Sequence, residues 1–375
     1  MEQDAIRAEF PVTKNYNFQN HAGVAPLSRR AAGAVRTYAT EAEADAYVGH
    51  AWYQHAETVR QSCATLINAN PDEIAFTKNT TEGLGFLANG LKWMTGDNVI
   101  STNVEFPANV YPWMALQSRG VQFKQVIEEN GRIPTESIIE AIDSRTRVVT
   151  ISAVQFASGY RSDLAAIGEA CQDKGVILCV DAIQALGILP IDVQAMHIDV
   201  LATDGHKWLC GPEGAGFFYC RKELLGHVKP SSVGWICMKN AEDYGNYEFE
   251  FRDDARRFDS GSYNLVGLMG LGASVDLLLE IGIDRIWSHV RALTDRLVDG
   301  VRDKGYRVIS SRRKDEASGI VAFISDLHDH HEIQRHLQQE YRLVIAVREG
   351  RLRSSPHLYN TSEEIDQLVE LLPRH

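Results

Sequence analysis

Short apolar, β-branched runs alternate with helix-like segments between residues 70 and 225. Seven runs have the length and composition of strands: Glu73–Thr77, Asn98–Thr102, Val121–Val126, Arg147–Ser152, Val176–Asp181, Asp199–Thr203 and Ala215–Cys220. Segments with apolar residues at helical spacing lie between them, such as Leu84–Met94, Ser137–Asp143 and Leu164–Lys174. This alternation is typical of βαβ units, so the sequence predicts a doubly wound α/β domain with a mostly parallel sheet.

The pattern changes after Leu265. Long helical stretches are followed by short strands and a final helix: Leu265–Ile281, Ile286–Gly305, a strand near Val308, Ile320–Ile324 and Glu363–Leu372. The 375 residues have room for two or three domains. We expect a large α/β domain over residues 15–262 and a smaller α+β domain over residues 263–375, which the N-terminal segment 1–14 joins.

Charge and cysteine usage limit the classes of partner. The chain has 38 Lys and Arg against 50 Asp and Glu, a net charge of −12 that would repel a phosphate backbone. No apolar run reaches the ~18 residues of a membrane helix, and the acidic start is unlike a secretory signal. The six cysteines are widely spread, which is typical of reduced thiols. We therefore expect a cytoplasmic protein without nucleic-acid or membrane partners.

Lys207 is the most informative single residue. It follows the buried-looking strand Asp199–Thr203 within the turn Asp204-Gly205-His206. Ligands of open α/β sheets bind at the carboxyl ends of strands. A partly desolvated lysine at such an end has a lowered pKa and can form a bond with an aldehyde. A lone lysine is more often a solvated surface residue, so the interpretation depends on its neighbours.

Three other strand ends supply complementary groups. Asp181 ends a strand and suits a partner for a pyridine nitrogen, although it could equally cap a helix. Thr80 and Thr81 begin a predicted helix and could bind a phosphate there, or they could only cap the helix. Phe106 could present an aromatic face to a flat ligand, or it could be packed in the core. Together with the lysine, these groups predict a site for pyridoxal 5′-phosphate (PLP).

The chain resembles the class V aminotransferase family, which includes cysteine desulfurases, selenocysteine lyases and isopenicillin N epimerases. The resemblance covers nearly the whole length and rests on Asn20–Pro26, Asn79–Gly83, Asp181–Gln184, Gly205–Lys207 with Gly211–Gly216, Arg257–Ser262 and Arg351–Thr361. It implies the fold type I of PLP-dependent transferases, like aspartate aminotransferase. It also implies a homodimer with the active site at the subunit interface.

The resemblance also implies roles for individual residues. Lys207 would form a Schiff base with PLP and then carry the α-proton of an amino-acid substrate, and Asp181 would pair with the pyridinium nitrogen. The other implied cofactor contacts are Thr80, Thr81, Phe106, Gln155, Gln184, His206 and, across the dimer interface, Gly261 and Ser262. Arg353 would bind the substrate carboxylate. The loop with His21, Ala22 and Gly23 would line the substrate side.

Three positions depart from the family pattern. Asp204 stands where a small residue, often Ser, is usual, and its carboxylate would repel a phosphate unless turned away or paired. Phe106 replaces the histidine of the desulfurases, which removes an acid/base group above the ring. No cysteine lies beyond Cys237, so the nucleophilic cysteine that desulfurases carry shortly before the carboxylate-binding arginine is missing. We do not expect a cysteine-persulfide mechanism.

The first expectation for activity is an aminotransferase, and the alternative is a C–S or other β-eliminating lyase, or an amino-acid epimerase, of the same family. Outside this class, a non-catalytic scaffold or a His-rich metal-binding protein remains open. The histidines of His328–His336 lack the i, i+4 spacing of a zinc-binding helix, so we expect no metal site. Aromatic residues that could wall the substrate pocket are Trp113, Tyr160, Tyr263 and His357.

Overall fold

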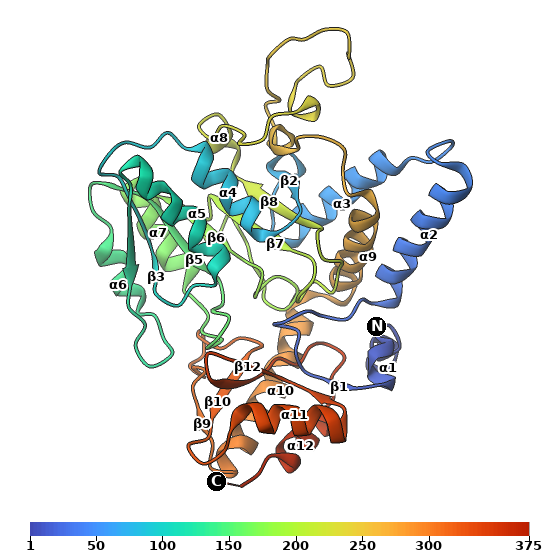
Figure 1. Ribbon diagram of the computed structural model, residues 1–375, viewed down its shortest axis with the longest axis vertical. Coiled ribbons are helices and arrows are strands. Elements are labelled where there is room, and N and C mark those ends of the chain that lie inside the picture. The colour runs from blue at the N-terminus through green and yellow to red at the C-terminus, as the bar shows by residue number, and fades with distance from the viewer. Residues whose placement is uncertain (375) are drawn as a thin grey trace.

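A seven-stranded sheet forms the centre of the larger lobe of the computed structural model, which describes residues 1–374 (Figure 1). Its strands are β2 (Ile74–Thr77), β3 (Asn98–Thr102), β4 (Gln122–Val126), β5 (Thr146–Ser152), β6 (Ile177–Asp181), β7 (Val200–Asp204) and β8 (Gly216–Cys220). They lie in the order β2-β8-β7-β6-β5-β3-β4, and β8 alone runs antiparallel to its neighbours. Every predicted strand is confirmed to within one residue at each end. The carboxyl ends of the other six strands therefore share one edge.

Helices cover both faces of this sheet. They are α2 (Arg29–Asp45), α3 (Trp52–Leu66), α4 (Thr80–Gly90), α5 (Tyr111–Met114), α6 (Thr135–Ala141), α7 (Leu164–Lys174) and α8 (Lys222–Leu225). The prediction for α4 started four residues too late, because the Asn79 side chain accepts from the Glu82 N–H and begins the helix there. Short 3-10 helices span Pro11–Lys14, Pro71–Glu73, Pro107–Asn109, Ala115–Arg119, Trp235–Cys237 and Ala255–Phe258.

The smaller lobe contains a four-stranded antiparallel sheet in the order β12-β13-β10-β9. Its elements are α10 (Ile283–Asp303), β9 (Arg307–Val308), β10 (Val321–Ile324), α11 (His330–Tyr341), β12 (Ala346–Arg348), β13 (Arg351–Ser354) and α12 (Ser362–Leu371). The N-terminal segment joins this lobe: β1 (Asn17–Phe18) pairs with β11 (Leu343–Val344), and Arg7 of α1 (Gln3–Ala8) forms an ion pair with Glu364.

The helix α9 (Leu265–Ile281) lies in the larger lobe, beside α2 and α3 (Figure 1). Its buried residues belong to the core of the central sheet. A separate core begins at Leu293 and continues to Leu372. We therefore propose that the boundary between the two domains lies within α10, and not at the expected residue 263.

No single helix of the described chain is long and apolar enough to cross a membrane. The helices α9 and α10 meet that criterion only as a pair, and they are bent by 80° relative to each other.

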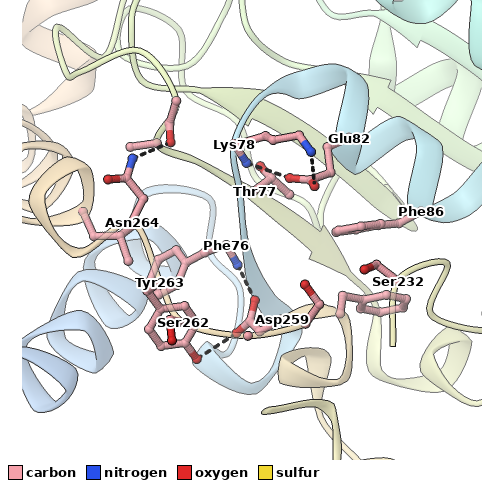
Figure 2. A pocket seen from close by; sticks show the side chains of 16 residues that line it. Phe76, Thr77, Lys78, Glu82, Phe86, Ser232, Asp259, Ser262, Tyr263 and Asn264 are labelled. Atoms are coloured by element: carbon pink, nitrogen blue, oxygen red, sulfur yellow. Dashed lines mark hydrogen bonds and ion pairs between the residues drawn. The ribbon is translucent and has the colours of Figure 1, made fainter. Parts of the chain in front are cut away.

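A buried ion pair fastens α3 to the segment that precedes α9. The Arg60 guanidinium is fully buried, lies 3.0 Å from Asp259 Oδ2 and donates to the Ile74 carbonyl at 2.5 Å. Asp259 also accepts from the Phe76 N–H and from the Tyr263 hydroxyl, as Figure 2 shows. Because each charge lies away from water, each depends on the other for its stability.

We predict that Asp259→Asn lowers the free energy of unfolding by about 2–4 kcal/mol, because it removes the buried counter-ion of Arg60 and leaves only the partly exposed Glu57, which lies 3.2 Å from the Arg60 Nε. Urea denaturation measures this change. The matched control Asp173→Asn lies on the exposed face of α7 and should change stability by less than about 0.5 kcal/mol. A loss below about 1 kcal/mol for Asp259→Asn would contradict the assigned role.

Candidate active site

A cavity of about 610 Å³ opens where the carboxyl edge of the central sheet faces the smaller lobe. Its walls come from the N-terminal loop, the start of α4, the segments that follow β3 and β5, the ends of β6 and β7, and the β12–β13 hairpin. The side chains in this lining that could bind a ligand or take part in chemistry are Asn20, Thr80, Thr81, Phe106, Asp181, Gln184, Asp204, His206, Lys207, Arg348 and Arg353. Most of the residues that the sequence singled out therefore meet in one place.

Lys207 lies in the turn after β7 and is 9% exposed. Burial lowers its pKa to about 8; Asp181 opposes this change, and the nearby arginines Arg353 and Arg348 reinforce it. Its Nζ is 5.3 Å from the centre of the Phe106 ring. Near neutral pH a useful fraction of this amine is therefore unprotonated, as attack on an aldehyde requires.

Asp181 ends β6 and is 2% exposed. Burial raises the pKa of its carboxyl to about 7, although the Ile183 N–H donates to Oδ1 at 3.0 Å. No cation lies within ion-pair distance of it in residues 1–374. A protonated pyridine nitrogen would supply the missing positive partner, so this carboxylate fits the ring end of PLP.

The start of α4 provides the anion end of the cavity. The first N–H groups of a helix have no intrahelical acceptor, and both Thr80 and Thr81 line the cavity. The Thr80 hydroxyl is buried and has no hydrogen-bond partner in the described chain. An unpaired buried donor at a helix N-terminus fits a phosphate group.

Asp204 is turned toward its own loop. Its Oδ1 accepts from the Gly205 N–H at 2.7 Å, and its Oδ2 lies 2.8 Å from His206 Nδ1. The carboxylate that departs from the family pattern is therefore paired, which reduces its repulsion of a phosphate. It also fixes the His206 ring, whose Nε2 remains available for a ligand.

Phe106 and Gln184 line the cavity, and their contacts with PLP stay predictions. Phe106 is 43% exposed and makes an edge contact with Phe156, so one ring face is open to a flat heterocycle. The Gln184 side chain donates to the Ala22 carbonyl and accepts from the Trp208 indole, which fixes its orientation.

Gln155 is not among the residues that line the cavity, and its contact with PLP stays a prediction. Its Nε2 donates to Glu105 Oε1 at 2.7 Å within a buried network. The same carboxylate accepts from the Ser152 hydroxyl and the Asn109 amide. Glu105 therefore fixes the amide nitrogen of Gln155, while the buried Oε1 has no hydrogen-bond partner in the described chain.

Arg353 brings a buried positive charge into the cavity from β13. It is 1% exposed, donates to the Phe156 carbonyl at 2.7 Å, and has an Nε without a partner in residues 1–374. Burial, and then the charge of Arg348, lower its pKa to about 9. A buried guanidinium with no acidic neighbour suits the carboxylate of a substrate.

The N-terminal loop contributes Ala22 and Gly23 to the cavity as expected, but not His21. His21 is fully buried, with Nδ1 2.8 Å from the Ser355 carbonyl and Nε2 2.8 Å from the Tyr359 hydroxyl. Both ring nitrogens are therefore engaged, and the residue ties the loop to the smaller lobe. The four aromatic residues considered as pocket walls also lie elsewhere: Trp113, Tyr160, Tyr263 and His357.

Gly261 and Ser262 line a different cavity of about 260 Å³. Figure 2 shows Ser262, Tyr263 and Asn264 on one side of it and the Lys78–Glu82 pair on the other. Within one chain these residues are not brought to Lys207. A contact with PLP in another subunit remains a prediction.

Arg348 is the charged cavity residue that the sequence analysis missed. It precedes the turn Glu349-Gly350, in which both residues have positive φ angles of 48° and 68°. Asn-Gly and Asp-Gly are the strong two-residue hairpin signals, and Glu-Gly is not one of them. Gly350 alone is a weak indication that Arg348 lies beside the strand of Arg353.

The histidine-rich segment is engaged in local hydrogen bonds. The His330 ring contacts backbone groups of Gly350 and Ser325, and His328 Nε2 lies 3.0 Å from the Arg374 carbonyl. Among residues 1–374, no group of three or more His, Cys, Asp or Glu side chains is arranged to hold a metal ion. The geometry gives the metal-binding alternative no support.

The model of the Aminotransferase class-V family matches residues 27–368. The chain therefore belongs to the class-V aminotransferase family, whose members depend on PLP, as predicted. Similarity to solved structures confirms fold type I of the PLP-dependent transferases.

Three similar proteins are named for sulfur chemistry. A probable cysteine desulfurase of Methanothermobacter thermautotrophicus is 31% identical over 99% of this chain and 98% of its own length. The apo structure of a cysteine desulfurase from Thermococcus onnurineus NA1 has a TM-score of 0.90 at 24% identity, over 98% of this chain and 96% of that one. The cystine C–S lyase C-DES, solved with its product cysteine persulfide, has a TM-score of 0.88 at 24% identity, over 96% and 98% of the two chains.

We predict that the apoenzyme takes up PLP faster as the pH rises through about 8, because the unprotonated Lys207 amine is the reactive form. Stopped-flow absorbance after mixing with PLP measures the rate. Lys207→Arg keeps the positive charge and should show no covalent phase at any pH. A rate that is flat or falling between pH 7 and pH 9 would contradict the role of Lys207.

Proposed function

We propose that this protein is a PLP-dependent enzyme that removes the α-proton of an amino acid and transfers the amino group to a 2-oxo acid. One observation carries the proposal: Lys207, Asp181 and Arg353 are buried around the same cavity, and neither Asp181 nor Arg353 forms an ion pair within the described chain. A basic amine, a ring-nitrogen partner and a carboxylate receptor are the groups that this chemistry requires.

The cofactor end of the cavity holds PLP through residues of this chain. PLP, when bound, supplies an electron sink for the negative charge at the substrate α-carbon. Lys207 Nζ would bind its aldehyde carbon, and Asp181 would keep its ring nitrogen protonated. The start of α4 and His206 would bind the phosphate, and Phe106 would cover the ring.

The substrate end orients the amino acid. Arg353 binds the α-carboxylate with its planar, fixed donors, which limits the rotation of the substrate about its Cα–carboxylate axis. As a free amine, Lys207 would take the α-proton, and burial lowers its pKa to about 8, which suits a base. Burial of both residues excludes water that would compete for this proton.

The number of residues that can carry a proton near the substrate favours transamination over the other reactions of the family. Of the residues that line the cavity, Asp181 faces the ring nitrogen and Asp204 holds His206, which leaves Lys207 to move protons near the substrate. A single carrier can take a proton at the α-carbon and return it to the carbon of the original aldehyde. Epimerisation needs a second proton donor, and Phe106 stands where the desulfurases have histidine.

A C–S lyase is the second candidate, because the similar proteins are named cysteine desulfurase and cystine C–S lyase. A thiolate leaving group needs little acid assistance, since the pKa of a thiol is about 8.5. All six cysteines are buried, and none lines the cavity. In this reaction, we propose, sulfur leaves as part of a small molecule and not as a persulfide on the enzyme.

We also propose that the protein is a homodimer and is located in the cytoplasm. A homodimer would bring the Gly261–Ser262 segment of one subunit to the cavity of another, as the family resemblance implies. Six unpaired thiols suit a reducing compartment, so we propose a cytoplasmic location.

A panel of L-amino acids with and without 2-oxo acids tests the proposed reaction. Transamination predicts a new amino acid only when the acceptor is present, and conversion of PLP to pyridoxamine 5′-phosphate when it is absent. Elimination predicts release of pyruvate without an acceptor. Failure of the PLP-loaded enzyme to change the α-carbon of any amino acid would overturn the proposal.

We predict that Arg353→Gln lowers kcat/KM by about 100-fold, mainly through KM, because it removes the charged partner of the α-carboxylate. Arg351→Gln is the matched control, since Arg351 lies on the same strand but outside the cavity. Steady-state kinetics on the best substrate of the panel measure both. A change in kcat/KM of less than about threefold for Arg353→Gln would contradict its role.

A further inference from the structure

Arg348 and Arg353 present two positive charges to one cavity. Arg348 ends β12, and the register of the hairpin pairs Ala346 with Arg353. Because side chains alternate along a strand, Arg348 projects from the same face of the hairpin as Arg353 and is its diagonal neighbour. Both line the cavity that contains Lys207.

The charge of Arg348 acts inside this cavity. It lowers the pKa of Arg353 and contributes to the lowered pKa of Lys207. Arg348, unlike Arg353, is exposed to solvent; it forms no ion pair within residues 1–374, and its Nη1 donates to the Val347 carbonyl. Two guanidinium groups on one wall repel each other until anions enter.

The other charged groups of the cavity have partners once PLP and an α-carboxylate are bound. Asp204 holds His206, Asp181 faces the ring nitrogen, and the start of α4 faces the phosphate. Arg353 takes the α-carboxylate. Arg348 alone remains without an anion.

We propose that the substrate carries a second carboxylate on its side chain, which Arg348 binds. This inference rests on the proposed function and names its substrate class as acidic amino acids, together with the matching dicarboxylic 2-oxo acids. The apolar cavity residues Phe18, Val24 and Phe156 would surround the connecting carbon atoms. Arg348 is thus a specificity-determining residue, because a neutral side chain would leave it unpaired.

Pairs of substrates that differ only in charge test the proposal on the PLP-loaded enzyme. We expect kcat/KM to be at least about tenfold higher for glutamate than for glutamine, and for aspartate than for asparagine. Arg348→Gln should bring the ratio of kcat/KM between each acid and its amide close to one, because it raises KM for the acids more than for the amides. Arg348→Lys should retain part of it. Arg351→Gln removes an equal charge outside the cavity and should leave the preference intact.

A binding measurement without turnover separates this inference from the proposed reaction. Calorimetry should show that the PLP-loaded enzyme binds glutarate at least about tenfold more tightly than butyrate, and that Arg348→Gln removes the difference. Turnover of amino acids without preference for acids, or a preference that survives Arg348→Gln, would overturn the inference and leave the proposed function standing. Selective glutarate binding with no turnover would uphold the dianion site and overturn the proposed function.

Discussion

The burial of unpaired charge at one edge of the sheet is the constraint on which the site depends. Asp181 and Arg353 are each nearly inaccessible, and neither has a partner of opposite charge in the described chain. Such groups cost several kcal/mol each when desolvated without compensation. Burial disfavours the charged form of each group, and it therefore raises the pKa of the Asp181 carboxyl and lowers that of the Arg353 guanidinium. A ligand with a cationic ring and a carboxylate offsets both, which links the fold to its chemistry.

The rest of the molecule holds this arrangement rigidly. The chain satisfies the charges that it does not offer to a ligand: Arg60 meets Asp259 beneath the larger lobe, and Asp204 meets His206 beside the cavity. His21 fastens the N-terminal loop to the smaller lobe through Ser355 and Tyr359. The contrast between paired and unpaired buried charges therefore distinguishes structural residues from those that face a ligand.

The sequence predicted the site residues that lie at strand ends. It missed the placement of residues that depends on contacts distant in sequence. Lys207, Asp181 and Thr80 each directly follow or end a strand, so the parallel sheet alone brings them together. His21 has the right chemistry, but Ser355 and Tyr359, which are distant in sequence, engage both of its ring nitrogens. Arg348 was missed because β12 and β13 are three and four residues long, too short to show a periodic pattern.

The most direct test of the account is to reduce the PLP-loaded enzyme with borohydride, digest it, and locate the modified residue by mass spectrometry. The account predicts one phosphopyridoxyl group per chain, on Lys207, which Lys207→Ala removes. Modification of a different lysine, or none after saturation with PLP, would contradict it.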